Sequence, residues 1–378
     1  MIGAGIIGAA CAYFLASAGL RVHVIDARGW AAGASGAGQG ALVAWDHATA
    51  ASRRMSREGI GMWAQLAPEL ATETGVDIEH RSVGSLVAVV DENLLAEGEA
   101  RCTALDSQGI SVRWLDCRAV HECEPLVAPS VGGGLYFPAD GLLEPRLATV
   151  ALLRAAQRRG ATCTLYEPVR AMQESHASVV VSTDARSCTA DLVILAAALE
   201  TPWLAGLLGF SLPIRAVKGH VAVVVETDLR IGRFVSEYLP DRRPDAGGSG
   251  PTLWSSVQPT AAGPVLVGGS RETGDNLDRS VDIDLACSLP ARAATLIPWL
   301  TRSILLRVYA GLRPASIDGT PFVGHLPGHP RVLVAAGHGG AGIMMAPATG
   351  KLIAELALGI PATLPVELYA PGRAEIAT

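Results

Sequence analysis

The chain has 378 residues, which is long enough to bury a large core and is typical of two lobes rather than one small domain. Its net charge is −6 and it contains no run of basic residues, so nucleic acid is not an expected partner. Seven scattered cysteines include no C-x-x-C pair, which predicts a reducing cytoplasm and neither a zinc nor an iron–sulfur site.

The first 26 residues combine the parts of a dinucleotide-binding βαβ unit. Gly3, Gly5 and Gly8 form G-x-G-x-x-G, an apolar segment follows, and a short β-branched strand ends at Asp26. The first glycine permits a tight turn, the second lets the backbone approach a pyrophosphate, and the third lets the helix lie against the sheet. The helix N-terminus attracts phosphates, and the acid accepts hydrogen bonds from ribose hydroxyls. The pattern therefore predicts dinucleotide binding.

Residues 1–20 carry no charge and have the length of a membrane-spanning helix. Glycine and alanine add little hydrophobicity, however, and Arg21 begins the next strand without a spacer. A signal peptide would need a basic segment before the apolar run, and none precedes it. We therefore expect a soluble βαβ start and no transmembrane segment. Because only two residues precede Gly3, we also expect part of the first strand to be missing upstream of Met1.

The next stretch, Ala31–Leu42, is too rich in glycine to be predicted as a helix or a strand. Its small residues suggest a backbone pressed against a ligand, with a flexible loop as the alternative. Apolar residues at helical spacing then predict a helix over Thr49–Thr74, which Gly75 ends. Up to residue 137 we expect strands at 83–90, 112–115 and 132–137 and helices at 92–108 and 118–123.

Pro145 begins a predicted helix that ends at Arg159, with Gly160 behind it. A polar, glycine-rich loop is expected at 241–251. The other predicted elements are strands at 162–165, 179–182, 192–196, 217–225, 253–257, 265–268, 305–312 and 332–335 and helices at 282–300 and 343–358. The predicted fold class is α/β, a Rossmann-like lobe with an inserted, mostly antiparallel α+β substrate lobe. The expected boundaries are 1–83, 138–215 and 305–378 for the first lobe and 84–137 and 216–304 for the second.

Two later segments could carry chemistry. In the first, Tyr309–Pro314, a lone Arg313 at the end of an apolar strand needs an anionic partner or solvent, and Pro314 favours an extended backbone before it. A surface or structural ion pair is the alternative interpretation. The second segment, 335–347, is predicted to be a strand, a glycine-rich turn and a helix whose N-terminus would suit a ring that gains negative charge on reduction. Taken alone, His338 in this turn fits a structural histidine better.

Together, the G-x-G-x-x-G opening, the A-G-L-R-P strand and the glycine-rich C-terminal turn resemble the FAD-dependent D-amino acid oxidase superfamily. The resemblance covers the whole chain in order and includes Asp318–Pro321 and Ala346–Gly350. It is strongest to the branch of glycine oxidase, sarcosine oxidase and dehydrogenases of D-amino acids and hydroxyproline. It implies an FAD enzyme that oxidises the C–N bond of a small D-amino or secondary (imino) amino acid by hydride transfer to flavin N5, giving an imine.

The resemblance also implies a set of site residues. Arg313 would hold the substrate carboxylate through a bidentate contact, which a guanidinium makes well. The isoalloxazine would rest between residues 38–42 and 339–344, and Val169 would lie near the adenine. Noncovalent FAD is expected because the C-terminal segment has no cysteine. The expected FAD contacts are Gly3, Gly5, Ile6, Ile7, Gly8, Asp26, Ala27, Arg28, Ser35, Gly40, Ala41, Leu42, Val169, Ala197, Gly337, His338, Gly339, Gly340, Gly342, Ile343 and Met344.

Two alternatives stay open. The chain could be the flavin subunit of a multi-subunit, dye-linked dehydrogenase of the opine dehydrogenase, hydroxyproline dehydrogenase or hydrogen cyanide synthase type. It would then be inactive without electron-accepting partner subunits, and could lie at the membrane periphery through a partner. An NAD-dependent enzyme is the weaker alternative, since the glycine motif and Asp26 suit both cofactors.

Overall fold

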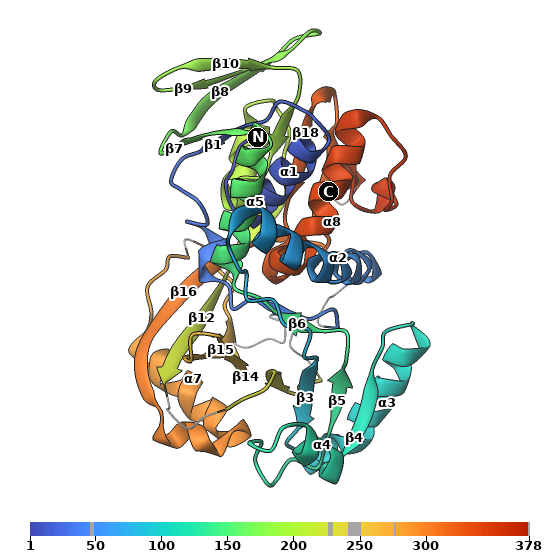
Figure 1. Cartoon of the computed structure of the whole chain (residues 1–378), viewed down its shortest axis with the longest axis vertical. Coiled ribbons are helices and arrows are strands. Elements are labelled where there is room, and N and C mark those ends of the chain that lie inside the picture. The colour runs from blue at the N-terminus through green and yellow to red at the C-terminus, as the bar shows by residue number, and fades with distance from the viewer. Residues whose placement is uncertain (46–48, 226–229, 241–250, 276, 377–378) are drawn as a thin grey trace.

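The computed structural model describes all residues except 46–48, 226–229, 241–250, 276 and 377–378, so nearly all of the loop predicted at 241–251 lies outside the described residues. Figure 1 shows two lobes, one with long helices around a parallel sheet and one built on a large sheet. The chain crosses between them several times, as a discontinuous first lobe requires. The α/β fold class with an inserted, mostly antiparallel sheet is confirmed.

The first lobe is centred on parallel strands. Ile2 joins two strand pairs, because it bridges Ile25 on one side and Leu195 on the other. The strands are, in spatial order, β7 (Thr162–Leu165), β1 (His23–Asp26), β11 (Val193–Leu195), β18 (His329–Ala336) and the antiparallel β17 (Phe322–Leu326). The carboxyl ends of these strands point toward the second lobe, where α/β proteins bind their ligands.

Four helices pack closely on this lobe: α1 (Ile6–Ser17), α2 (Ala50–Thr74), α5 (Pro145–Arg158) and α8 (Gly342–Leu358). A side chain at Gly59 would clash with the Met344 carbonyl, so this glycine lets α2 lie directly against α8. The run Gly339–Leu358 has the length and apolar composition of a membrane span, but 67% of its most apolar window is buried. It is therefore the central helix of the core.

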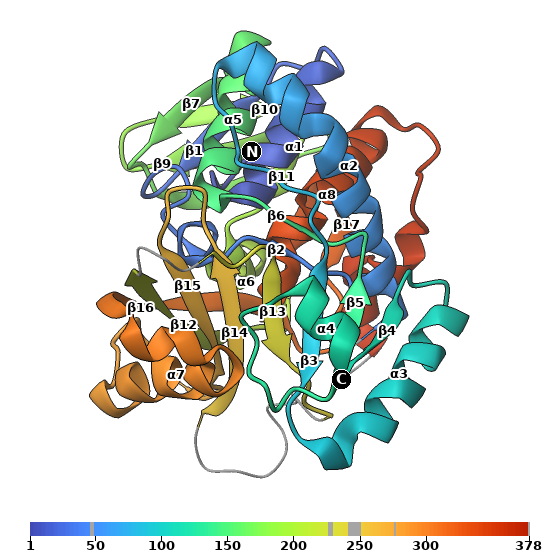
Figure 2. The ribbon, with the colours of Figure 1, turned by 60° about the horizontal axis from the view of Figure 1, so that its bottom comes forward.

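The second lobe is an eight-stranded sheet, which Figure 2 shows beneath the helices. Its only parallel pair among the described strands is β13 with β3. The strands are, in spatial order, β16 (Ile304–Ser316), β12 (Ile214–Val225), β15 (Val265–Arg271), β14 (Thr252–Pro259), β13 (Phe234–Glu237), β3 (Ser85–Val89), β5 (Gly133–Phe137) and β4 (Arg113–Asp116). Helix α7 (Ile283–Leu296) covers the outer face near β14 and β15, while α3 (Leu95–Ser107) and α4 (Cys117–Cys123) lie beside β5 and β4.

The smaller elements correct several expectations. Ala31–Leu42 is not devoid of regular structure, because it contains a 3₁₀ turn at Ala34–Ala37 and strand β2 at Ala41–Leu42. Pattern analysis also missed β13, β17 and short half-exposed elements with too little apolar periodicity to be recognised. The elements not yet given are β6 (Gly141–Leu142), β8 (Val169–Glu174), β9 (Val179–Thr183), β10 (Ser187–Ala190) and α6 (Thr201–Gly206).

Candidate active site

A cavity of about 1620 Å³ runs from the N-terminus of α1 to the inner face of the eight-stranded sheet. Of the site residues expected from the sequence, two do not line it: Leu42 is fully buried in the core, and Gly8 packs α1 against the Gly3 carbonyl. The others, brought together from five separate segments, are Gly3, Gly5, Ile6, Ile7, Asp26, Ala27, Arg28, Ser35, Gly40, Ala41, Val169, Ala197, Arg313, Gly337, His338, Gly339, Gly340, Gly342, Ile343 and Met344.

At one end of the cavity the glycine motif forms a tight turn into α1. Gly3 has φ +112°, a conformation that favours glycine, and a side chain there would clash with the Ala196 carbonyl. The Ile6 N–H, one of the first donors of α1, donates to Ser35 Oγ at 2.9 Å. A Cβ at Gly5 would lie 3.2 Å from the same hydroxyl. Backbone donors, a helix N-terminus and a serine hydroxyl thus meet where Gly5 leaves space, which is the chemistry that binds a phosphate.

Asp26 lies at the end of β1 and holds the surrounding backbone. Its Oδ2 accepts from the Ala4 N–H at 2.7 Å and its Oδ1 accepts from the Arg28 N–H at 2.8 Å. The carboxylate lines the cavity next to the glycine motif. A carboxylate oxygen can accept more than one hydrogen bond, so ribose hydroxyls could be added to this arrangement.

The C-terminal turn lies on the other side of the cavity, at the beginning of α8. His338 is buried there, and its Nε2 is 3.0 Å from Thr349 Oγ1. Burial lowers the pKa of His338 to about 3, so the ring is neutral near pH 7. The indole N–H of Trp63 donates to the Ile343 carbonyl at 2.9 Å and fixes the first turn of α8. Gly342, Ile343 and the N-terminus of α8 therefore face the cavity on a rigid support.

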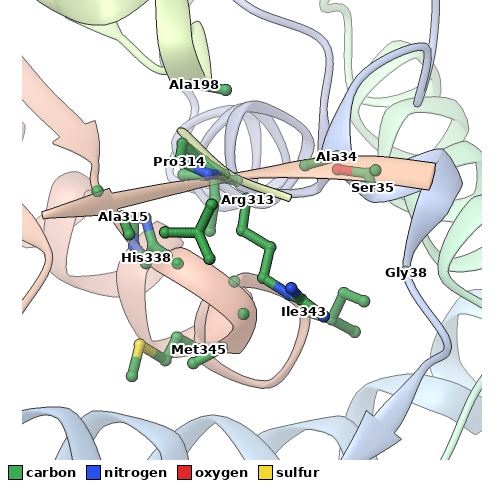
Figure 3. Close-up of a pocket in the computed structure, with 18 of the residues that line it drawn as sticks. Ala34, Ser35, Gly38, Ala198, Arg313, Pro314, Ala315, His338, Ile343 and Met345 are labelled. Atoms are coloured by element: carbon green, nitrogen blue, oxygen red, sulfur yellow. The ribbon is translucent and has the colours of Figure 1, made fainter. Parts of the chain in front are cut away.

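Arg313 lies inside β16 rather than after its end, because the strand expected at 305–312 extends to Ser316. Its guanidinium lies flat over Gly219 of β12, where any side chain would clash with it. Nη1 donates to the Lys218 carbonyl at 3.3 Å and to the Ser270 carbonyl at 3.1 Å. Figure 3 shows the side chain pointing from β16 toward Ile343 at the start of α8. The guanidinium is thus aimed into the cavity.

A break in the strand register supplies one of these carbonyls. Lys218 faces Glu272, so an unbroken ladder would pair the His220 N–H with the Ser270 carbonyl, but Ala222 already faces Val267, one residue out of step. The His220 N–H instead donates to Ser270 Oγ at 2.9 Å. Its ring Nδ1 lies 2.8 Å from the same oxygen. The Ser270 hydroxyl therefore replaces the carbonyl in the ladder, and the carbonyl accepts from Arg313.

The rest of the cavity floor is also made of glycines. The Trp254 ring lies over Gly269, where a Cβ would be 2.6 Å from Cζ2, and the Arg271 guanidinium lies 5.7 Å from the ring centroid. Beside them, Ser256 Oγ and the Gln39 amide lie over Gly268. Sequence analysis did not single out Gly219, Gly268 or Gly269, although a glycine inside a strand often marks a close approach to another group.

The geometry fits a bound dinucleotide. The cavity is larger than the roughly 300–1,000 Å³ of an ordinary small-molecule pocket, as a dinucleotide and a substrate together require. Its ends offer a phosphate-type cradle and a cationic side chain. No cysteine lies among the described residues that line it.

The comparisons with known proteins give consistent results. A family model described as FAD dependent oxidoreductase matches residues 1–356. Glycine oxidase of Bacillus licheniformis is 27% identical over 366 residues, which cover 96% of this chain and 93% of that protein. An opine oxidase subunit of Agrobacterium tumefaciens strain Ach5 is 25% identical over 350 residues, covering 90% and 88%. The crystal structure of glycine oxidase from Geobacillus kaustophilus superimposes with a TM-score of 0.88 at 26% identity, covering 98% and 96%.

Proposed function

Because this chain belongs to the family of FAD-dependent oxidoreductases, we propose that it oxidises the C–N bond of a small D-amino or secondary amino acid to an imine. The observation that carries this proposal is the single cavity that joins the cradle at α1 to the Arg313 guanidinium. The glycine oxidases that it resembles act, by name, on an amino acid. Substrate chirality and side chain are part of the proposal and are addressed by the experiment below.

The oxidation removes two electrons and two hydrogens from the substrate. FAD, when bound, supplies the two-electron acceptor, which takes the hydrogen of the carbon next to nitrogen as a hydride. The nitrogen loses its proton as the C=N bond forms. The chain contributes placement: Arg313 binds the carboxylate with two parallel hydrogen bonds and so fixes the direction of the adjacent C–H bond. We assign no general base, because a neutral amine needs none and His338 is buried against Thr349.

The residues at the other end of the cavity would hold the cofactor noncovalently. The N-terminus of α1, Gly5 and Ser35 would bind the pyrophosphate, and Asp26 the adenosine ribose. Gly342 and Ile343 at the N-terminus of α8 would face the isoalloxazine, where a helix N-terminus stabilises negative charge gained on reduction. A cytoplasmic location is proposed with this function, supported by seven cysteines that form no disulfide.

A second candidate function is the flavin subunit of a multi-subunit dehydrogenase, with electron-accepting partner subunits. It is favoured by the beginning of β16, the strand at the edge of the sheet, where Ile304, Leu305 and Leu306 are 66%, 44% and 55% exposed. Three consecutive exposed apolar residues on an edge strand are typical of a surface that a partner covers. The similarity to a protein named as an opine oxidase subunit supports the same alternative.

One experiment separates these candidates. The purified protein is mixed anaerobically with D-, L-, N-methyl and cyclic amino acids while flavin absorbance is recorded. Bleaching by an amino acid, with turnover on oxygen or a dye, supports a self-sufficient enzyme. Bleaching without turnover on any acceptor supports the flavin-subunit alternative. A flavin that no amino acid reduces, but that dithionite does, would contradict the proposed C–N oxidation.

A further inference from the structure

A polar cluster lies on the cavity-facing side of the sheet beside Gly268. Ser256 pairs with Gly268 across β14 and β15, and a Cβ on this glycine would be 2.8 Å from Ser256 Oγ and 3.0 Å from both amide atoms of Gln39. Ser256 and Gln39 line the cavity. Gln258, two residues along β14, donates from its Nε2 to the Gln39 carbonyl at 2.6 Å. The cluster thus joins the substrate lobe to the segment expected beside the flavin.

Three atoms of this cluster lack a hydrogen-bond partner among the described residues. They are Ser256 Oγ, Gln39 Nε2 and Gln258 Oε1, and all three are buried. Ser256 is 1% exposed and Gln258 is 2% exposed, so bulk water does not reach them freely. Buried polar groups in folded proteins nearly always have a partner. Three such atoms at one place in a ligand cavity therefore indicate a group that binds there and completes their hydrogen bonds.

The donors and acceptors of the cluster select the chemistry of that group. The Gln39 amide nitrogen can only donate, the Gln258 amide oxygen can only accept, and the Ser256 hydroxyl can do both. A carboxylate only accepts and would leave Gln258 unsatisfied, while an ammonium only donates and would leave Gln39 unsatisfied. A hydroxyl group both donates and accepts, so it matches the set.

The cluster also lies at the right place relative to the carboxylate anchor. Ser270, whose carbonyl accepts from Arg313, is two residues from Gly268 on β15. A small amino acid bound at Arg313 would therefore extend its side chain or ring over Gly268. We propose that Ser256, Gln39 and Gln258 form a subsite for a hydroxyl group of the substrate, so that the enzyme selects hydroxylated amino or imino acids. This inference rests on the proposed function, because it takes Arg313 as the carboxylate anchor.

The first test compares matched substrates that differ by one hydroxyl. Proline is compared with the 4-hydroxyproline isomers, and alanine with serine, in both configurations. A site built to hydrogen-bond a hydroxyl discriminates strongly against the analogue that lacks it, so kcat/KM should be at least about tenfold higher for one hydroxylated member. Ser256→Ala should remove most of this ratio and Ser256→Thr, which keeps the hydroxyl, should retain it. The matched control is Ser255→Ala, because Ser255 is equally buried but donates to the Arg292 carbonyl instead of lining the cavity.

The second test measures binding without turnover. Cyclopentanecarboxylate and the 3-hydroxycyclopentanecarboxylate isomers carry the carboxylate but no nitrogen, so they are not oxidised, and their Kd is read from the flavin absorbance. Tighter binding of a hydroxylated isomer by wild type, lost in Ser256→Ala and kept in Ser255→Ala, is the expected result.

Each other outcome overturns a defined part. Equal binding of both carboxylates by wild type, with both weakened in Arg313→Ala, overturns the hydroxyl subsite and leaves the proposed function standing. If Ser256→Ala weakens both carboxylates equally, the cluster holds only an ordered water or the fold, and the subsite is again wrong. If Arg313→Ala changes neither Kd, the carboxylate anchor fails and the subsite with it.

Discussion

Arg313 is oriented by neutral groups. The Lys218 and Ser270 carbonyls fix Nη1 through hydrogen bonds, and neither oxygen cancels the positive charge of the guanidinium. The absent side chain of Gly219 allows the guanidinium to lie on the sheet instead of standing above it. A cation held in this way keeps both its direction and its attraction for an anion, as an anchor for a carboxylate requires.

Replacing Arg313 should therefore affect substrates according to their carboxylate. A charge-assisted hydrogen bond contributes about 1.5–3 kcal/mol, and a factor of ten in rate corresponds to about 1.36 kcal/mol. Arg313→Ala should lower kcat/KM for an amino acid at least about tenfold, and Arg313→Lys should recover only part of it because an ammonium lacks the fork geometry. The decarboxylated amine should be a poor substrate of wild type and should lose little more in Arg313→Ala. Equal losses for amino acid and amine would show that Arg313 only supports the fold.

His338 should affect stability and FAD retention rather than the reaction rate. Its pKa is lowered to about 3 in the folded protein against an ordinary 6.5, so the unfolded chain binds the extra proton between these values. The ring therefore makes the protein less stable as pH falls from about 6.5 toward 3. His338→Asn should flatten this part of the pH profile of the thermal unfolding midpoint and weaken FAD retention, while kcat stays near that of wild type. A pH-dependent loss of kcat with FAD fully retained would instead make His338 catalytic.

At the scale of the elements, the register break between β12 and β15 is what turns a backbone carbonyl toward Arg313. Sequence patterns predicted both strands but could not predict this break, because it depends on which strands are neighbours. The same limit explains why β16 was expected to end before Arg313. Pro314 suggests a strand end in a sequence, yet β16 lies at the sheet edge, where a missing N–H is tolerated.

The serine that closes the break should be needed for tight carboxylate binding. In Ser270→Ala the His220 N–H loses its acceptor and should recapture the Ser270 carbonyl, which takes a hydrogen bond from Arg313. KM for the amino acid should rise about three- to tenfold, since a neutral hydrogen bond contributes about 0.5–1.5 kcal/mol. The decarboxylated amine should be unaffected. His220→Asn keeps an acceptor for the serine hydroxyl and should resemble wild type, whereas His220→Leu should resemble Ser270→Ala; the reverse order would refute this role.

The turn before α1 was predictable because its function constrains it residue by residue. Gly5→Val should abolish FAD binding, since a branched side chain would press on Ser35 and fill the space of the pyrophosphate. Purified variant protein should be colourless but folded by circular dichroism. Gly61→Val is the control: it adds the same side chain to the middle of α2, where nothing lies within 4 Å, and should keep its colour. A yellow Gly5→Val protein would place the cofactor elsewhere.

Considered as a whole, the molecule separates two tasks between its lobes. The cofactor cradle is built at the ends of parallel strands and at two helix N-termini, and its glycine-rich motifs can be recognised in a sequence. The substrate wall is built by side chains of an antiparallel sheet, where strand pairing decides which residues meet. Asp26, Ser35 and Arg313 were therefore predictable, while Gln39, Ser256 and His220 were not, because nothing in their local sequence indicates what lies opposite them.

The absence of cysteine from the described cavity lining predicts that the flavin can be removed intact. Acid precipitation should release all of the yellow colour into the supernatant. The recovered apoprotein should unfold at a lower temperature than the FAD-loaded protein, because a ligand that binds only the folded state stabilises it. Colour that stays with the pellet would mean a covalent bond and would refute noncovalent attachment.

The glycines beneath the substrate wall also have an evolutionary consequence. Gly219, Gly268 and Gly269 each leave a space that one neighbouring side chain occupies: Arg313, Ser256 and Trp254 respectively. Exchanging a glycine and its neighbour together would move a side chain from one strand to the next without changing the cofactor cradle, which belongs to other elements. Such paired exchanges would let lineages acquire new substrates in two steps while the flavin chemistry stayed constant. A directed-evolution library that varies these glycines jointly with their neighbours should reach new substrates more often than one that varies the neighbours alone.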